Sequence, residues 1–394
     1  MTKGKFTFLL VSYCLVLIAW FLYSITQNDL NLTISSNNTL FTIQKFFQNI
    51  GYFQRPLSTV IFIGLLLLYF IFYLQLIILT VKKLISKKQI FILLLLTVVM
   101  LLLSYPAFSY DLFNYLFYGR IITHYGLSPY NFRALDFPAD TWTRFMHWTH
   151  NTYPYGPIWL AITVPLSFLG QQKFIITLIL YKLLMAGGFL FSGLFIYKIA
   201  KALKINNPLL ILVLFSFNPL IIIESLISSH NDIVMIAFSL VGFYWLIKEK
   251  LFPSLLFILI ASAVKLAVIP LFITWLIVVV FRVYKRSISL PKILLLTFSL
   301  MLLAFLYYLK DHSLQPWYFL WFFPFGLLLN SKYVHLSLIF LSLGFLGNYA
   351  PFLFFGNWDK PVPFLNTAVT LFCFLLGLIV STIIYISRGS RQFI

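Results

Sequence analysis

Acidic residues are scarce in this sequence, with nine Asp and Glu against 28 Lys and Arg in 394 residues. Charged residues of both signs make up only 9% of the chain, 61% of it is hydrophobic, and the mean hydropathy is +0.97. Apolar runs recur at roughly the ~20 residues that a helix needs to cross the ~30 Å hydrocarbon core of a bilayer. The composition therefore predicts a protein that crosses a membrane several times.

The hydrophobic runs lack alternation between polar and apolar residues. Segments such as "TAVTLFCFLLGLIVSTIIYI" (367–386) are continuously apolar, whereas the strands of a membrane barrel alternate. Helices and closed barrels are the structures that satisfy their backbone groups in lipid. The predicted fold class is therefore all-α, a polytopic helical bundle. The first apolar segment, 6–25, has no small-residue cleavage site, and we expect it to be a retained span.

Cysteine is nearly absent, and familiar metal and phosphate motifs are not visible. Cys14 and Cys373 both fall inside expected spans, where neither a disulfide framework nor a metal cluster is predicted. His147 and His150 are three residues apart and could hold a metal, but beside tryptophan we interpret them as facing lipid headgroups. We predict no bound metal and no cofactor, and leave a divalent ion open.

The basic residues occur in small clusters between the apolar runs. This pattern is typical of orientation signals in membrane proteins, so we predict no nucleic-acid partner. Placing the clusters on the cytoplasmic side puts both termini there and predicts about twelve transmembrane helices. The segment 157–170 is left over; it is short and contains Pro165, and we expect an interfacial or re-entrant helix. The expected spans are 6–25, 57–80, 90–105, 174–197, 208–227, 233–247, 252–266, 269–283, 290–309, 316–329, 333–350 and 363–387.

This orientation gathers the scarce acids on one side. Eight of the nine carboxylates and five of the six histidines fall at or near the outer face. The outer loop 106–156 is about fifty residues long, and structureless loops of that length are usually functional or locally folded. Within it, "YDLFNYLFYGRIITHYG" (110–126) and "DTWTRFMHWTH" (140–150) are predicted to form short amphipathic helices at the membrane interface. The outer face is where we expect the chemistry.

Several stretches of the sequence resemble a known family. Asp111 directly follows a span, Tyr115 lies in the aromatic-rich helix behind it, and "GLSPYNF" and "YPYGP" come later in the same loop. This order resembles the first outer loop of the GT-C glycosyltransferases, in particular the polyprenol-phosphate-mannose-dependent (dolichol-phosphate-mannose-type) mannosyltransferases. The stretches "NPLIIIESLISSHND" (218–232), "AVKLAVIP" (263–270) and "QPWYFLWFFP" (315–324) resemble later parts of the same group.

The resemblance covers roughly residues 90 to 325 and leaves residues 1–80 outside. One departure is that Asp111 lacks the adjacent second acid of many relatives, since its neighbours are Tyr110 and Leu112. This counts against a metal-dependent donor site. The resemblance implies a GT-C-like catalytic core at 90–330 that includes the outer loop 106–156. We expect an N-terminal pair of transmembrane helices in 1–89 to precede it and C-terminal transmembrane helices in 331–394 to follow.

The function implied by the resemblance is that of an inverting glycosyltransferase. It would move a hexose, with mannose as the expected sugar, from a polyprenyl-phosphate-linked donor to the hydroxyl of a glycan, glycolipid or other acceptor. We expect an integral protein of the plasma membrane that contacts membrane lipids and has its active site on the outer face. A lipid-linked sugar flippase or another transporter is the alternative, because Lys182 and Lys265 interrupt apolar runs. A duplicated half, which inverted repeats would show, is not visible.

Sugar transfer from a lipid phosphate assigns a chemical role to each candidate residue. Asp111 is the predicted base for the acceptor hydroxyl, with a helix N-cap as its alternative role. The leaving phosphate needs cations, and Arg120, His230 and Lys265 are the candidates near the outer ends of spans. Lys265 could instead snorkel to the interface.

The remaining candidates carry two interpretations each. Glu224 and Asp232 flank a turn and would orient the acceptor or pair with Lys265 or Arg120. Trp317, Tyr318 and Trp321 would stack on a sugar or belong to the aromatic belt, which is the commoner role. Lys182 lies too deep for headgroup chemistry and is predicted to snorkel inward.

Overall fold

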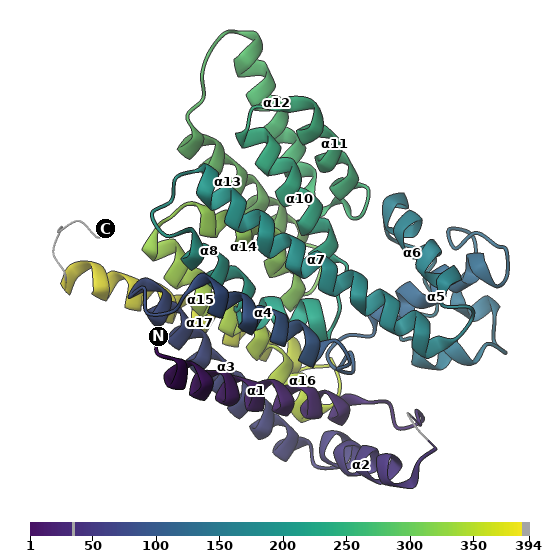
Figure 1. Cartoon of the computed structure of the whole chain (residues 1–394). Helices are drawn as coiled ribbons and strands as arrows, with labels where there is room; N and C mark the ends of the chain where they lie inside the picture. The colour runs from purple at the N-terminus through teal and green to yellow at the C-terminus, as the bar shows by residue number, and fades with distance from the viewer. Residues whose placement is uncertain (34–35, 388–394) are drawn as a thin grey trace.

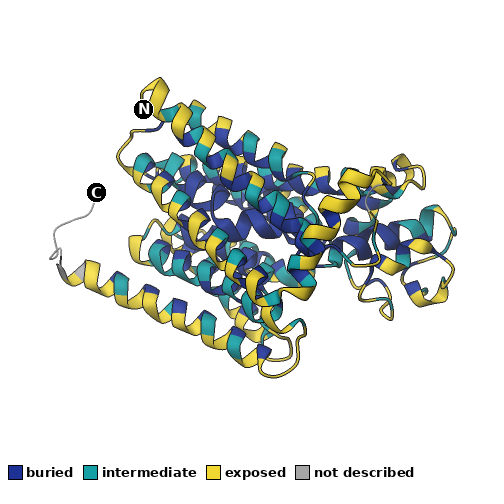
Figure 2. Cartoon of the chain, turned by 90° about the horizontal axis from the view of Figure 1, so that it is seen from below, coloured by how far each residue is buried: buried dark blue, intermediate teal, exposed yellow. Residues whose placement is uncertain are grey.

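The structure is a computed structural model that describes residues 1–33 and 36–387, and the described residues contain helices and no strand. Seven helical segments are long and apolar enough to cross a membrane, and a bent pair would make an eighth. The helices pack into a bundle whose interior is buried and whose outer faces are exposed (Figures 1 and 2), and many large apolar side chains lie on those outer faces. The seven are built on α1 (Lys3–Ser24), α3 (Arg55–Val81), α7 (Phe174–Ala202), α12 (Ile269–Val283), α13 (Leu290–Tyr308), α15 (Lys332–Gly347), which α16 (Tyr349–Phe355) continues, and α17 (Val362–Ser387).

All twelve expected spans are helical, which confirms the fold class but does not establish twelve crossings. Four of them are short: α4 (Lys87–Leu101), α10 (Asp232–Ile247), α11 (Leu251–Ser262) and α14 (Phe319–Leu328) have 15, 16, 12 and 10 residues. At about 1.5 Å per residue, none of these helices reaches the ~30 Å of a hydrocarbon core. The division at residues 89 and 330 stays a prediction, and residues 388–394 of its last segment lie outside the described residues.

The predicted span 208–227 is broken in the middle. Helix α8 (Pro208–Ser216) ends before the Asn218-Pro219 step. Helix α9 (Pro219–Ile222) follows and continues as a π-helical turn (Ile223–Ile227). The segment 219–227 is bent by 55° relative to α8. The Asn218 side chain accepts a hydrogen bond from Leu220 N at 2.9 Å, so it caps the new helix. Every residue from 211 to 237 is buried. The break therefore delivers a polar turn, Ser228–Asn231, into the interior of the bundle.

The expectation that Lys182 snorkels inward, toward the cytoplasmic surface of the membrane, is wrong. Lys182 lies in the first half of α7 and is buried, and its Nζ donates to Ser104 O at 2.6 Å and to Leu226 O at 3.0 Å. Ser104 follows the end of α4 and Leu226 belongs to the π-helical turn, so both carbonyls lie outside regular α-helix. The ammonium stays inside because broken helices leave backbone acceptors for it.

The outer loop is only partly as predicted. Helix α5 (Asp111–Thr123) is present, but the second expected helix is reduced to a 3-10 turn, Thr141–Phe145. Helix α5 is buried on nearly all sides rather than lying on the membrane with one polar face. The loop folds over it, and the Tyr118 hydroxyl donates to the carbonyls of Asn151 and Thr152 at 3.3 Å. The leftover segment forms α6 (Pro157–Leu169), which packs against α5 and α7.

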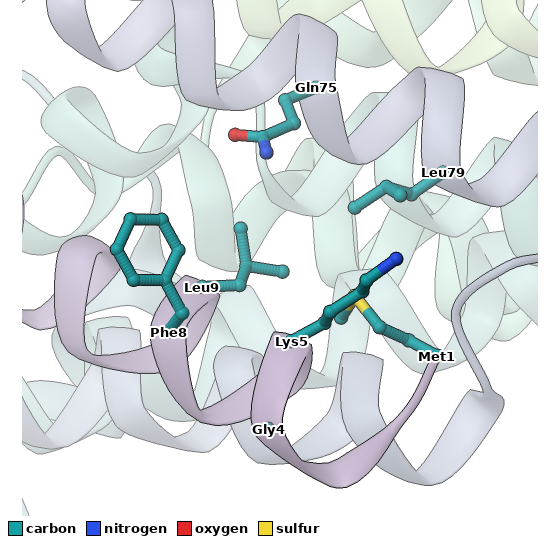
Figure 3. Close-up of a pocket in the computed structure, with 7 residues that line it drawn as sticks. All are labelled: Met1, Gly4, Lys5, Phe8, Leu9, Gln75 and Leu79. Carbon is teal, nitrogen blue, oxygen red and sulfur yellow. The ribbon is translucent and has the colours of Figure 1, made fainter.

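The two ends of the bundle differ. Helices α5 and α6 lie at one end, whereas the N-terminus and the last turns of α17 lie at the other (Figure 1). At that far end, a groove between the first turns of α1 and the end of α3 is lined mostly by apolar side chains, with Lys5 and Gln75 as its polar members (Figure 3). None of the residues that line this groove belongs to the candidate site around Asp111 and His230 that is described below.

The short helix α2 (Asn38–Gln48) is amphipathic in the reverse sense. It buries Gln44 and Gln48, while Leu40 and Phe46 are exposed. The amide of Gln48 donates to Asp29 O at 2.7 Å, which ties the helix to the segment after α1. An apolar face turned outward is the arrangement of a helix that lies in the membrane interface.

Candidate functional site

Asp111 is the first residue of α5, Tyr110 occupies the N-cap position, and the Asp111 carboxylate accepts from a side-chain hydroxyl rather than from a backbone N–H. The N-cap alternative is therefore wrong. One Asp111 oxygen, Oδ2, instead accepts a hydrogen bond from the Tyr115 hydroxyl one turn later at 3.5 Å, and lies 3.7 Å from His230 Nδ1. The Asp111 side chain is 18% exposed, whereas that of His230 is fully buried. Asp111 is thus the member of this cluster that a substrate can reach.

His230 lies between two carboxylates. Its Nε2 is 3.3 Å from Glu224 Oε2, on the side opposite Asp111. The other Glu224 oxygen accepts a hydrogen bond from the Tyr349 hydroxyl at 3.0 Å. The Trp317 ring stacks on the imidazole with centroids 4.0 Å apart. The imidazole therefore has a fixed plane with one carboxylate at each nitrogen.

Asp232 and Lys265 form a second polar pair beside the first. The Lys265 ammonium donates to both Asp232 oxygens at 3.0 and 2.9 Å, and Trp321 Nε1 donates to Oδ1 at 2.6 Å. Of the alternatives for these residues, ion pairing is confirmed, and Lys265 does not snorkel away as an isolated charge. Its side chain is still 21% exposed, so the pair is not fully enclosed.

Arg120 is not brought to this cluster. It lies nine residues after Asp111, about 13 Å along the helix at 1.5 Å per residue. Its Nε pairs with Asp140 Oδ2 at 2.5 Å, its Nη1 donates to Gln172 Oε1 at 2.6 Å, and its guanidinium lies over the Trp142 ring at 4.4 Å. The prediction that Arg120 faces the leaving phosphate beside Asp111 therefore finds no support in its contacts.

The aromatic residues near Pro316 do not form an interfacial belt. Tyr318 and Trp321 are buried and pack on each other with ring centroids 4.8 Å apart, while Trp317 covers His230. Their rings hold the polar side chains of the cluster in place, so the belt interpretation is wrong for Tyr318 and Trp321.

Several buried polar atoms of the cluster have no well-aligned hydrogen bond among the described residues. They include both nitrogens of His230, Oε2 of Glu224 and the whole side-chain amide of Asn231. Buried polar groups in proteins are nearly always bonded, so a concentration of unpaired ones marks a place with bonding capacity in reserve. This reserve lies directly behind Asp111.

Comparison with known families bears on this cluster. A family model described as "Alpha-(1->6)-mannopyranosyltransferase, N-terminal domain" matches residues 8–282, which is more than half of the chain. The chain belongs to this mannopyranosyltransferase family. The resemblance drawn from the outer-loop motifs is confirmed, and Asp111, His230 and Lys265 all lie within the match. The expectation that residues 1–80 lie outside is wrong, because the match begins within α1.

The chain is also similar to individual members. It is 28% identical over 173 residues to alpha-(1->6)-mannopyranosyltransferase A of Corynebacterium glutamicum, covering 43% of this chain and 35% of that protein. It is 27% identical over 166 residues to the enzyme of the same name in Mycobacterium tuberculosis, covering 41% and 31%. The matches thus span about a third of the length of these relatives. No solved structure matches the chain.

In this family member the charge state of the outer-loop acid follows from its neighbours. Burial alone would raise the pKa of Asp111, but His230, Lys265 and the Tyr115 hydroxyl together hold it below its ordinary value. Burial and the nearby carboxylates raise the pKa of Tyr115 well above its ordinary value, so the hydroxyl stays a donor. Asp111 is therefore a carboxylate at neutral pH and able to accept a proton.

Metal-binding groups are not assembled in the described part of the chain. No three His, Cys, Asp or Glu side chains there are arranged to hold an ion. His147, one of the two histidines that were considered for a metal, stacks on Tyr110 with ring centroids 3.6 Å apart.

Sequence reasoning did not name Tyr349, and it did not predict that the Trp321 N–H donates to Asp232. Both lie in apolar stretches far along the chain from Glu224 and Asp232, and their local pattern is that of ordinary buried aromatics. The available signal was the rule that a buried tyrosine or tryptophan needs a partner for its O–H or N–H.

Proposed function

We propose that this chain transfers mannose from a polyprenyl-phosphate-linked donor to an acceptor hydroxyl, with inversion at the anomeric carbon. Family membership supports the sugar, and the observation that carries the chemistry is the partly exposed Asp111 carboxylate backed by a buried imidazole. Asp111 takes the proton of the acceptor hydroxyl while the oxygen of that hydroxyl forms a bond to C1 of mannose. The bond from C1 to the phosphate oxygen breaks, and its electron pair leaves with the phosphate. Attack opposite the leaving group inverts the configuration.

The donor would approach from the lipid. A polyprenyl phosphate keeps its head at the interface and its tail in the bilayer, so the site must lie at headgroup depth. Lys265 meets that requirement, since it lies between α11 and α12 with part of its side chain exposed. An ammonium has three donors, and a phosphate oxygen can take one while Asp232 keeps the others. The acceptor would be a glycan, a glycolipid or another hydroxyl compound, and the reaction as written needs no cofactor.

The transporter alternative loses its support. It depended on Lys182 and Lys265 as intramembrane charges on a transport path, and these two are bonded to backbone carbonyls and to Asp232. Charges fixed in this way have bonding partners that do not require a moving substrate.

The test is a transfer assay with the purified protein in nanodiscs. Radiolabelled polyprenyl-phosphate mannose is offered together with a panel of glycan and glycolipid acceptors, and polyprenyl-phosphate glucose serves as the comparison donor. We expect a mannosylated product whose new linkage has the inverted configuration, formed about 10² to 10⁴-fold more slowly by the Asp111→Asn variant. Movement of the lipid-linked sugar between leaflets without any product would contradict the proposal and favour a flippase.

We also propose that the protein lies in the plasma membrane with both termini in the cytoplasm and the Asp111 cluster on the outer face. Leu135 in the outer loop and Lys88 at the start of α4 are both exposed and serve as reporters. In a variant without Cys14 and Cys373, Leu135→Cys should react with an impermeant thiol reagent on intact cells, and Lys88→Cys only after lysis. The reverse result would overturn the orientation.

A further inference from the structure

Glu224 is a carboxylate that the proposed reaction does not use. It lies in the π-helical turn of the broken span and its side chain is fully buried. Burying a carboxylate costs several kcal/mol unless hydrogen bonds compensate for the lost water. Tyr349 supplies one bond, at 3.0 Å to Oε1, and the other oxygen faces His230. An apolar residue would fill this position at no such cost, so the acid requires an explanation.

His230 connects this acid to Asp111. Its Nε2 lies 3.3 Å from Glu224 and its Nδ1 lies 3.7 Å from Asp111. The stacked Trp317 ring fixes the imidazole plane, and the turn that carries His230 holds Ser229 at a positive φ of 61°. Carboxylate, imidazole and carboxylate are therefore aligned from the exposed end of the cluster to its buried end.

We propose that His230 and Glu224 form a positioning pair that receives the proton from Asp111 and holds it, an inference that rests on the proposed function. A buried acid on one imidazole nitrogen selects the tautomer and stabilises the imidazolium, as in hydrolase triads. Here Glu224 holds Nε2–H, so that the lone pair of Nδ1 faces Asp111. Asp111 is the catalytic residue, and the pair acts through it.

The proton balance closes within these three residues. The acceptor hydroxyl loses its proton to Asp111 Oδ2, and the proton then passes from Oδ2 to Nδ1 of neutral His230. The imidazolium lies between two carboxylates, Asp111 is again an anion, and no redox partner is involved. The proton returns through Asp111, the exposed member, to water after the product leaves. The 3.7 Å gap must close by about 1 Å for this step, a contraction common when substrates bind.

Few other charges act on the imidazole. Asp111 faces it from α5, with the Tyr115 hydroxyl bonded to that carboxylate; Glu224 faces it from the π-helical turn, and Tyr349 acts through Glu224. Asp232 is the next acid along the chain, but Lys265 is paired with it. A pH profile of the reaction therefore reports mainly on Asp111, His230 and Glu224.

The test compares Glu224→Gln with Asp140→Asn. The second variant also converts a buried carboxylate into an amide, but Asp140 pairs with Arg120 near the other end of α5. For both variants, kcat and KM are measured from pH 5 to 9 in nanodiscs. Glu224→Gln should lower kcat on the order of 10² to 10³-fold with little change in either KM. The acid limb of its kcat profile should move to lower pH, because the imidazolium has lost an anionic neighbour. Asp140→Asn should keep the wild-type limb.

Tyr349→Phe provides a variant that removes a single hydroxyl and leaves the packing intact. It should lower kcat about tenfold with unchanged KM, since Glu224 loses the bond that orients it. If Tyr349→Phe and any folded Glu224→Gln protein keep the wild-type kcat and pH profile while Asp111→Asn is inactive, the positioning pair is ruled out and the proposed function stands. Absence of any transfer by the wild-type protein would overturn both.

Discussion

The two ends of α5 carry opposite charges, and these charges differ in how close their bonding partners lie. Arg120, near its C-terminal end, has ion-pair and hydrogen-bond distances of 2.5 and 2.6 Å and a ring beneath its guanidinium. Asp111, at its N-terminal end, has its closest side-chain partners at 3.5 and 3.7 Å. Their side chains are similarly exposed, at 12% and 18%. A charged side chain held by short hydrogen bonds stabilises the fold, whereas one with long contacts can still form hydrogen bonds to a substrate.

The acids at the two ends differ in the same way. Asp140 accepts bonds from Arg120, from the Tyr125 hydroxyl at 2.8 Å and from Trp142 N at 2.9 Å, so both of its oxygens are hydrogen-bonded. Asp111 has a buried imidazole beside it, and its own side chain is partly exposed. The comparison predicts that substitutions at the Asp111 end change catalysis and that substitutions at the Arg120 end change stability.

The largest expected effect is that of Asp111→Asn. The amide keeps the shape of the side chain but cannot accept the acceptor's proton, so kcat should fall about 10² to 10⁴-fold. Because the native carboxylate has only long contacts, the melting temperature should change little. Both quantities are measured on the same nanodisc preparation. A folded variant with near-normal turnover would show that Asp111 is not the base and would remove the distinction between the two ends.

Lys265→Met should have the next largest effect, on both stability and donor affinity. It leaves Asp232 buried and unpaired, which costs about 3–5 kcal/mol. The double variant Asp232→Asn with Lys265→Met removes the orphaned charge and should recover most of that stability. If Lys265 also contacts the donor phosphate, KM for the lipid-linked sugar should stay raised about tenfold or more in the double variant. Recovery of the wild-type donor KM would rule out the contact.

The smallest expected effect is the pH dependence at the Arg120 end. Burial alone would raise the pKa of Asp140, but Arg120, Trp142 N–H and the Tyr125 hydroxyl hold it below its ordinary 3.8. A lowered pKa stabilises the fold above the ordinary value, and this contribution is lost as the pH falls through the folded value. The melting temperature of the wild type should therefore fall more steeply below about pH 4 than that of Asp140→Asn. At pH 7 the variant should be less stable by about 1–3 kcal/mol. Equal slopes for the two proteins would show that the ion pair contributes no acid-sensitive stability.

The sequence predicted the helices because their signal is local. Continuous apolar runs exclude other backbone structures in lipid, and each expected span is indeed helical. The short α5 and the acid at its start were visible for the same reason, since that acid and most of the helix lie within one stretch of twelve residues, "SYDLFNYLFYGR". Motif order along the chain was enough to predict the family.

Partnerships between distant residues were decided by the tertiary structure. Composition could say that Lys182 and Lys265 were costly in an apolar run, but not that the one would find carbonyls at helix breaks and the other Asp232. Likewise, local pattern indicated an interfacial α5, and the loop that folds over it buried the helix instead. Burial and pairing depend on which segments meet in space, and a charge inside a membrane protein takes whichever partner the packing brings within reach. The sequence therefore determined where polar groups occur, and the fold determined that Asp111 lies beside a buried imidazole while part of its own side chain stays exposed.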